Sequence, residues 1–147
     1  MNTQDFLWQS VPEGAGSIIY MIDNSITKDN PAVKENLEKA VNLFDQCSPF
    51  FLALGDQYRQ HLLVQLALHP DGLTMADLAG KRRLSKPAIS YHLKVLKDCG
   101  MVTTKKNGTI VTYHLNFDDV FSQIQELVST VQNVKEAVGN KAVTGAE

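Results

Sequence analysis

The stretch Leu84-Ser-Lys-Pro-Ala-Ile-Ser-Tyr-His-Leu-Lys-Val-Leu-Lys97 decides the fold of this 147-residue chain. Ser85 is a residue type that caps helix N-termini, and Pro87 fits the first helical turn after such a cap. Gly100 suits the left-handed position just after a helix C-terminus. The stretch therefore predicts a helix from Ser85 to Cys99. Apolar residues spaced by four and three predict its buried stripe, namely Ile89, Leu93 and Leu96.

The segments on either side of this helix predict a known order of elements. Thr74 can cap a short helix that ends at Gly80, and a tight turn then leads to the helix described above. After that helix, the β-rich runs 101–104 and 109–115 flank Lys105-Lys-Asn-Gly108, and Asn-Gly between two such runs predicts a hairpin. A short helix, a turn, a second helix and a hairpin form a helix-turn-helix followed by a wing.

Helical patterns also lie outside this motif. Pro31 fits the first turn of a helix whose apolar stripe continues until Pro49 interrupts it. Another helix is expected to start at Gly55-Asp56 and to stop at the breaker cluster 69–72. The last helix starts near Phe117 and carries a heptad-like seam that suits packing against a second helix. The first stripe is Val33, Leu37, Ala40, Phe44 and Cys47, and the seam is Val120, Ile124, Leu127, Val131, Val134 and Val138.

These elements predict a mainly α fold with a small β-hairpin wing, that is, a winged helix-turn-helix with flanking N- and C-terminal helices. The length of the chain is typical of one domain with one hydrophobic core. We expect an N-terminal extension of unknown role at 1–30, the winged domain with its flanking helices at 31–138, and a flexible tail at 139–147. Within the extension, the run Ser17–Ile22 has the composition of a short strand.

Charge is unevenly distributed along the chain. The net charge of -2 at pH 7 argues at first sight against a nucleic-acid partner. The window 81–106, however, contains eight basic residues and one acid, Asp98, so that it carries +7 while the remainder carries -9. A basic block in an acidic chain is a candidate footprint for phosphates. A solvated lysine-rich surface is the simpler alternative, and charge alone does not decide between the two.

The basic block coincides with the outer face of the helix predicted at 85–99. When the apolar stripe points inward, the opposite stripe carries lysine, serine and tyrosine side chains, which contact phosphates or base edges in protein–DNA complexes. Two arginines lie in the turn before this helix, and two lysines lie at the tip of the hairpin. The predicted DNA-contacting residues are Lys86, Pro87, Ser90, Tyr91, Lys94, Lys97, Arg82, Arg83, Lys105 and Lys106.

At these residues the chain resembles the arsenic-repressor (ArsR) family of winged-helix transcriptional regulators. The resemblance runs from about residue 51 to residue 115, and its most specific part is Ser-x-Pro-Ala-Ile-Ser-x-His-Leu-x-x-Leu within the stretch quoted first. His92 also matches a family position, but it precedes an inward leucine and is expected to lie partly inward. Further matches are Leu54-Gly-Asp-Gln-Tyr-Arg59, Gly100-Met-Val102 and the Lys-Asn-Gly wing followed by Tyr113.

The resemblance implies a homodimer that represses an operon by occupying an imperfect palindrome in double-stranded DNA. Its terminal helices would form the dimer interface, although the seam of the last helix also fits an intramolecular core. A winged helix that has lost DNA binding and serves as a protein-interaction module remains an alternative, because the rest of the chain is acidic. The sequence identifies neither the operator nor the inducer.

Many members of this family release DNA when a metal binds, but the usual ligands are missing here. The segment Thr74–Gly80 contains no cysteine or histidine. The last helix offers Asp118 and Asp119 but no histidine, since His114 is the last one in the chain. Zinc needs about four nitrogen, sulfur or oxygen ligands, so we predict no metal site and no cofactor.

The remaining residues point to a cytoplasmic protein that is not an enzyme. Two cysteines and no export signal are typical of a reducing cytoplasm. A thiol-sensing variant of the repressor would pair Cys47 with Cys99, although each also fits a structural role. No apolar run approaches the roughly 20 residues that span a bilayer, which predicts no membrane partner. No Gly-rich phosphate loop or nucleophile–base motif is present in the sequence, so we expect no catalytic activity.

Overall fold

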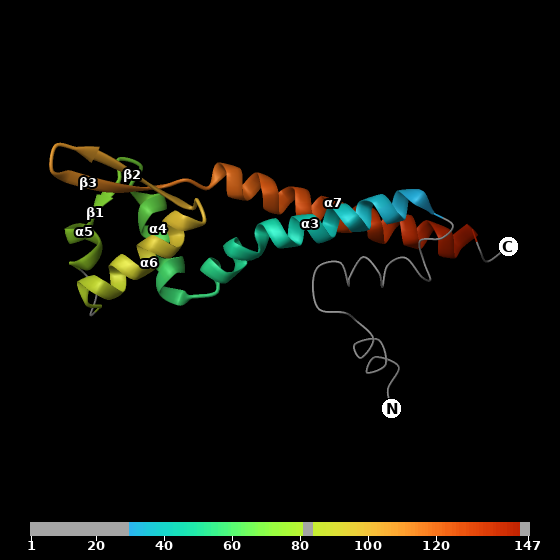
Figure 1. The fold of residues 1–147 in the computed structure, drawn as a ribbon, viewed down its shortest axis with the longest axis horizontal. Helices are drawn as coiled ribbons and strands as arrows, with labels where there is room; N and C mark the ends of the chain where they lie inside the picture. Colours follow the sequence, from blue (N-terminus) through green and yellow to red (C-terminus); the bar gives the residue numbers. More distant parts are fainter. Residues whose placement is uncertain (1–29, 81–83, 145–147) are drawn as a thin grey trace, which may run out of the picture. The chain divides into compact units, whose positions relative to one another are not determined.

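The structure is a computed structural model that describes residues 30–80 and 84–144, with side chains up to residue 139 (Figure 1). The expected extension, including its strand, lies outside the described residues apart from Asn30. The described chain divides into two compact units, one formed by residues 30–46 and 124–144 and the other by residues within 47–123. The elements are α3 (Pro31–Leu54), α4 (Gln57–Leu68), β1 (Leu73–Thr74), α5 (Met75–Ala79), α6 (Lys86–Asp98), β2 (Val102–Asn107), β3 (Ile110–Leu115) and α7 (Asp118–Thr144).

The helix-turn-helix of the second unit is formed by α5 and α6, and capping residues set its bounds. The Thr74 hydroxyl accepts from the Asp77 N–H at 3.2 Å, and the Asp77 carboxylate accepts from the Thr74 N–H at 2.9 Å, which is a capping box. Ser85 caps α6 by accepting from the Ala88 N–H at 3.4 Å. Gly100 follows α6 with a φ of +85°, as its position predicts. Both helices therefore lie where the sequence places them.

The wing is a three-stranded antiparallel sheet in the order β1-β3-β2. The pair Asn107↔Ile110 closes the hairpin, so the connection between β2 and β3 is a two-residue loop. Its first residue, Gly108, has a φ of +64°, and glycine is preferred there in type II′ turns. The expected turn at 105–108 is thus mostly strand. β1 was not predicted from the sequence, because a strand of two residues is too short to show an alternating pattern.

The core of the second unit collects apolar side chains from its helices and strands. The predicted stripe of α6 is buried, since none of its residues is more than 2% exposed. Gly72 has a φ of +86° and lies against His114, whose ring would be only 2.5 Å from an added Cβ. The buried apolar residues of this unit include Leu62, Leu63, Leu66, Leu78, Ile89, Leu93, Leu96, Met101, Val102 and Val120.

Two sequence predictions about α3 are wrong. Pro49 lies inside the helix and does not interrupt it, although proline leaves the carbonyl one turn earlier without its usual donor. The helix continues because its apolar spacing continues, with Phe50 and Ala53 buried beyond the proline. Phe44 was expected on the inward stripe but is 50% exposed, and Leu43 occupies the buried position.

In the first unit, α3 and α7 lie side by side. Lys39 Nζ forms an ion pair of 2.9 Å with Glu126 Oε1, and Leu127 of α7 is buried. α7 ends at Thr144 and so passes the boundary expected at residue 138, which makes the expected flexible tail helical as far as Thr144. With this long helix and the three-stranded wing, the expected fold class, a mainly helical winged helix-turn-helix, is confirmed.

Candidate nucleic-acid interface

The polar stripe of α6 faces solvent. Burial of the apolar stripe fixes the rotation of this helix about its axis, so that the opposite side is turned outward. Tyr91 is 62% exposed on that side. A helix fits the major groove of B-DNA, where exposed hydroxyl and ammonium groups meet base edges and phosphates. The other exposed residues of this outer face, as the sequence predicts, are Lys86, Pro87, Ser90, Lys94 and Lys97.

One lysine of the outer face has a partner within its own helix. Lys94 Nζ donates to Asp98 Oδ2 at 2.7 Å, one turn further along α6. This hydrogen bond and the charge of Asp98 raise the pKa of Lys94 above its ordinary value. The phosphate contact predicted for Lys94 would therefore require its ammonium group to leave Asp98 first.

The two wing lysines leave the sheet on opposite faces. Lys105 pairs with Thr112 and Lys106 with Val111, so both belong to β2 and not to the turn. Successive side chains of a strand point to opposite faces of its sheet. Lys105 lines an open cavity of about 390 Å³ together with His114 and residues of α4. Both lysines were predicted at the tip of the hairpin, and their separation onto opposite faces was not predicted from the sequence.

The arginines predicted to lie before α6, Arg82 and Arg83, are outside the described residues. Their contact with DNA therefore stays a prediction. The described part of the basic block contributes Lys86, Lys94 and Lys97 on α6 and the two lysines of β2.

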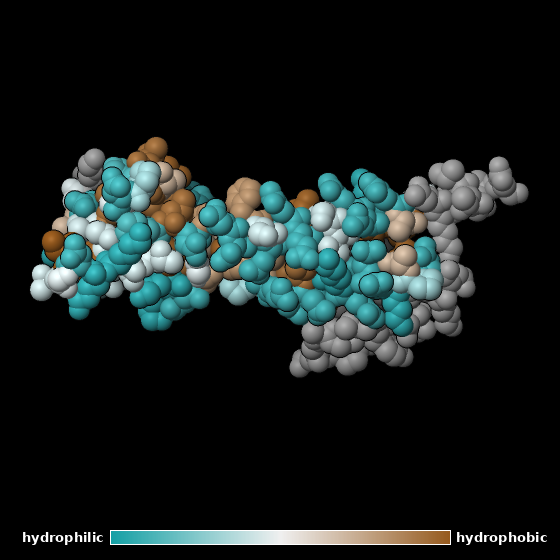
Figure 2. Space-filling view, turned by 90° about the horizontal axis from the view of Figure 1, so that it is seen from above, coloured by the Kyte–Doolittle hydropathy of each residue, from teal (hydrophilic) through white to brown (hydrophobic). Residues whose placement is uncertain are grey.

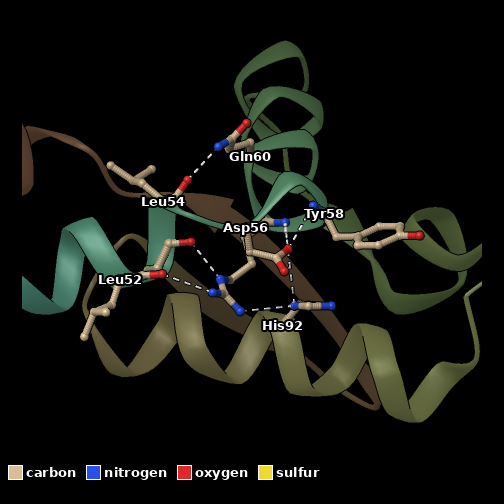
Figure 3. Close-up of polar contacts among 8 residues, drawn as sticks. Leu52, Leu54, Asp56, Tyr58, Gln60 and His92 are labelled. Carbon is tan, nitrogen blue, oxygen red and sulfur yellow. Dashed lines mark hydrogen bonds and ion pairs between the residues drawn. The ribbon is translucent and has the colours of Figure 1, made fainter.

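A polar network beside α6 was not predicted from the sequence (Figure 3). Arg59 donates from Nε to the Ala53 carbonyl at 2.7 Å and from Nη2 to the Leu52 carbonyl at 3.1 Å. Its Nη1 lies 3.3 Å from His92 Nδ1 of α6. The motif at 54–59 singles out Arg59 in the sequence. Spacing along the chain, however, does not predict its contact with a residue thirty-three positions away.

Asp56 organises the start of α4 within this network. Its Oδ1 accepts from the N–H of Tyr58 at 2.9 Å and from the N–H of Arg59 at 3.1 Å. The backbone hydrogen bond from Arg59 is the main cause that lowers the pKa of Asp56 below its ordinary value, and the neighbouring His92 and Arg59 side chains lower it further. Asp56 Oδ1 lies 3.8 Å from His92 Nδ1, which is too far for a hydrogen bond.

His92 lies partly inward, as its position before Leu93 predicts. Its side chain is 13% exposed. The imidazole stacks on Tyr58 with ring centroids 5.7 Å apart, and Tyr91 meets it edge-on at 5.6 Å. His92 therefore joins the outer face of α6, which we call the reading face from here on, to the first turn of α4.

The two cysteines are not in a disulfide. Cys47 has an exposed fraction of 0%, and Cys99 Sγ donates to the Leu96 carbonyl at 3.3 Å. Thiol oxidation depends on an accessible thiolate, so the burial of Cys47 does not favour the thiol-sensing variant. Among the described residues, no group of three or more His, Cys, Asp and Glu side chains could hold a metal ion.

No helix within residues 30–80 or 84–144 combines the length and the hydropathy that crossing a membrane requires.

Known proteins share this arrangement of helices and wing. Residues 61–109, from α4 to the hairpin, match the family model described as the MarR family. The arsenical resistance operon repressor of Staphylococcus xylosus is 33% identical over 89 residues, which cover 59% of this chain and 84% of that repressor. The chain belongs to the ArsR family. The Bacillus subtilis arsenical resistance operon repressor is likewise similar to this ArsR-family chain, with 34% identity over 77 residues, 52% of this chain and 71% of that repressor.

Solved structures agree with membership in the ArsR family. An ArsR family transcriptional regulator is 25% identical, has a TM-score of 0.55, and is covered over 92% of its length by 63% of this chain. An ArsR-like regulator from a Rhodococcus species, at 22% identity and a TM-score of 0.61, shares the fold over 73% of this chain and 97% of that chain. This ArsR-family chain is thus a DNA-binding transcriptional regulator and not an enzyme.

Proposed function

We propose that the chain is a cytoplasmic, homodimeric repressor that occupies an imperfect palindrome in the DNA upstream of its own operon. The observation that carries this proposal is the exposed polar face of α6 opposite a fully buried apolar stripe. Each copy reads one half-site with that face, and the wing and the turn before α6 contact the flanking backbone. The proposed contacts are Lys86, Pro87, Ser90, Tyr91, Lys94 and Lys97, with Lys105, Lys106, Arg82 and Arg83 on the backbone.

Electrostatics support this assignment to DNA over a protein-interaction role. The reading face of α6 carries Lys86, Lys94 and Lys97, and its one acid, Asp98, is already paired with Lys94. Lysines contribute to DNA affinity by replacing counterions condensed on the phosphates. The proposal involves no metal and no cofactor, and it leaves the inducer open.

The first unit supports the homodimer, because it leaves large apolar side chains of α3 and α7 exposed to solvent. The face of this unit drawn in Figure 2 is mostly hydrophilic, with hydrophobic atoms scattered between the polar ones. Val128, Val131 and Val138 recur along α7 at intervals of three and seven, and each is at least 38% exposed. With Phe44 of α3 they form what we name the α3–α7 apolar face. Heptad-spaced apolar residues pack on a matching stripe of another helix.

A groove in the same unit extends this face. It has a volume of about 460 Å³ and lies between α3 and α7. A second copy is the occupant we infer, because a two-fold interface brings identical stripes together and the groove is continuous with the exposed valines. Such a dimer also fits the proposed palindrome, since two copies related by a two-fold axis would read two half-sites about 34–36 Å apart. The lining residues are Leu37, Ala40, Val41, Phe44, Asp45, Val131 and Val134.

A gel shift over a salt series tests the repressor proposal. The probe is the duplex upstream of the gene for this chain, with a scrambled duplex of equal length and composition as competitor. We expect preference for the upstream duplex, and Lys86→Met and Lys94→Met each reduce the slope of log K against log salt by about one. Lys39→Met, which removes a lysine far from α6 in the sequence, serves as the control and leaves the slope unchanged. Equal binding to both duplexes at every salt concentration contradicts the proposal.

A further inference from the structure

We propose that Arg59 positions the recognition helix α6 by holding His92 in one tautomer and tying it to the C-terminal end of α3. The inference rests on the proposed DNA-reading role of α6. It concerns a positioning residue, because Arg59 acts through His92 and not by touching DNA. It is based on three polar contacts of the Arg59 guanidinium group and on the packing of two tyrosine rings against the His92 imidazole.

Two of the contacts fix Arg59 to the end of α3. The Leu52 and Ala53 carbonyls lie in the last turn of that helix, where no following helical N–H is available to them. The guanidinium group satisfies both carbonyls, and its positive charge suits the negative end of the helix dipole. Gln60 completes this arrangement by donating to the Leu54 carbonyl at 2.7 Å. The guanidinium group is therefore held by its own protein scaffold before any DNA arrives.

The third contact determines the protonation pattern of His92. Arginine has only donors and stays charged in proteins, so Nδ1 of His92 has to be the acceptor of the 3.3 Å contact. An imidazole that accepts at Nδ1 and is neutral carries its proton on Nε2. In Figure 3, the Nε2 side of the labelled His92 ring points away from Asp56. Arg59 thus selects the tautomer in which the outward nitrogen is a donor.

The residues around His92 allow the Arg59–His92 contact to fix the rotation of α6 about its axis. Tyr58 stacks on one side of the ring and Tyr91 meets it edge-on, so the ring has little freedom to rotate. His92 lies between Tyr91 and Leu93, and it is two residues away from both Ser90 and Lys94 of the reading face. A change in the position of the imidazole therefore changes the rotation of α6, and with it the direction in which the reading face presents its hydroxyl and ammonium groups.

Four variants of the full chain separate positioning from simple contact. Arg59→Met removes all three contacts, and His92→Phe keeps the stacked ring but removes the acceptor. His92→Gln keeps an acceptor oxygen for Arg59. Lys97→Met removes a proposed phosphate contact and provides the comparison for the salt slope. Each variant is first compared with the wild type by circular dichroism and thermal unfolding, so that loss of fold is recognised.

Affinity for the upstream duplex is the first readout. We expect Arg59→Met and His92→Phe to weaken binding about tenfold, as the loss of one charge-assisted hydrogen bond predicts, without changing the salt slope. His92→Gln stays within about threefold of the wild type, because the acceptor is restored. Lys97→Met reduces the slope by about one. A salt slope reduced by one in Arg59→Met would instead show that Arg59 contacts a phosphate. If His92→Gln binds the upstream duplex as weakly as His92→Phe, the hydrogen-bond acceptor at position 92 has no role in positioning α6.

Nitrogen NMR of the His92 imidazole in the DNA-free protein is the second readout. We expect one protonated and one unprotonated ring nitrogen in the wild type, with the proton on Nε2, and averaged shifts from mixed tautomers in Arg59→Met. A wild-type proton on Nδ1 overturns the inference. Because this measurement needs no DNA, it separates the two proposals. If the chain shows no preference for the upstream duplex but carries the proton on Nε2, the repressor proposal fails while the Arg59–His92 contact stands.

Discussion

The reading face of α6 and the α3–α7 apolar face both lie on helices with one apolar side. They differ in which side a single chain leaves exposed to solvent. In α6 the apolar stripe is fully buried within its own unit, and the exposed side is polar. In α7 Val120 and Leu127 are buried, while Val128 and Val131 remain exposed. A polar exposed face suits a solvated, charged partner, whereas an apolar exposed face requires a partner that excludes water.

The largest expected effect comes from placing a charge on the apolar face. Val128→Glu buries a carboxylate without a partner in the proposed interface, which costs about 3 kcal/mol and weakens the dimer about a hundredfold. DNA affinity falls with it, since one copy reads only one half-site. Sedimentation equilibrium measures the dimer dissociation constant of the full chain.

A valine of similar exposure outside this face provides the control for Val128→Glu. Val64 of α4 is 55% exposed, compared with 51% for Val128, and it lies outside the α3–α7 apolar face. Val64→Glu is expected to leave the dimer constant unchanged. If both variants behave alike, or if Val128→Glu dimerises like the wild type, the apolar face is not the dimer interface.

The second effect concerns the stability of the winged unit by itself. Gly72→Ala places a Cβ 2.5 Å from the His114 ring at a φ of +86°, so it combines backbone strain with a clash. We expect a loss of about 2–3 kcal/mol in the free energy of unfolding, measured in urea, with an unchanged dimer constant. Gly108→Ala has a positive φ of +64° but no atom within 4 Å, and it loses only about 1 kcal/mol. Equal losses in the two variants would show that the His114 contact is unimportant.

Much of the winged unit could be predicted because its signals are local. Ser85, Thr74 and Gly100 act through atoms within a few residues, so composition and spacing located both helices of the helix-turn-helix. The Arg59–His92 contact joins residues far apart in the sequence, and no periodicity reports it. β1 was missed for a related reason, since its two residues are strand only because β3 pairs with them.

The flanking helices were harder to predict, because their patterns allow more than one outcome. Pro49 usually ends a helix, but continued burial at Phe50 and Ala53 outweighs the lost hydrogen bond. The spacing of Phe44 fits the inward stripe as well as an exposed apolar face, and periodicity cannot separate positions that lie side by side on a helix. Sequence alone therefore found the polar reading face more readily than the apolar face.

A smaller effect tests the polar face through its acid. Asp98→Asn removes the carboxylate that holds Lys94 at 2.7 Å and frees this lysine for DNA. Exposed ion pairs of this kind contribute about 0.2–1 kcal/mol, so we expect binding to the upstream duplex to strengthen about threefold. The gel shift at constant salt measures it, with Glu126→Gln as a control that breaks the ion pair of Lys39 instead. Weaker binding in Asp98→Asn would mean that Asp98 itself contributes a favourable contact with DNA.

The smallest effect follows from the lowered pKa of Asp56, whose Oδ1 accepts hydrogen bonds from two N–H groups at the start of α4. Because the folded-state pKa is below the unfolded-state value, ionised Asp56 stabilises the fold above about pH 4, and this contribution is lost as the pH falls through the folded-state pKa. Asn is also a good N-cap, so Asp56→Asn removes mainly the charge and costs about 0.5 kcal/mol at pH 7. Urea unfolding of both proteins from pH 7 to pH 2.5 should show this difference shrinking towards zero, and the dimer constant at pH 7 should be the same for both. A difference that stays constant across this range would assign the stabilisation to the geometry of the cap, whereas a changed dimer constant would show that the winged unit and the apolar face are not energetically independent.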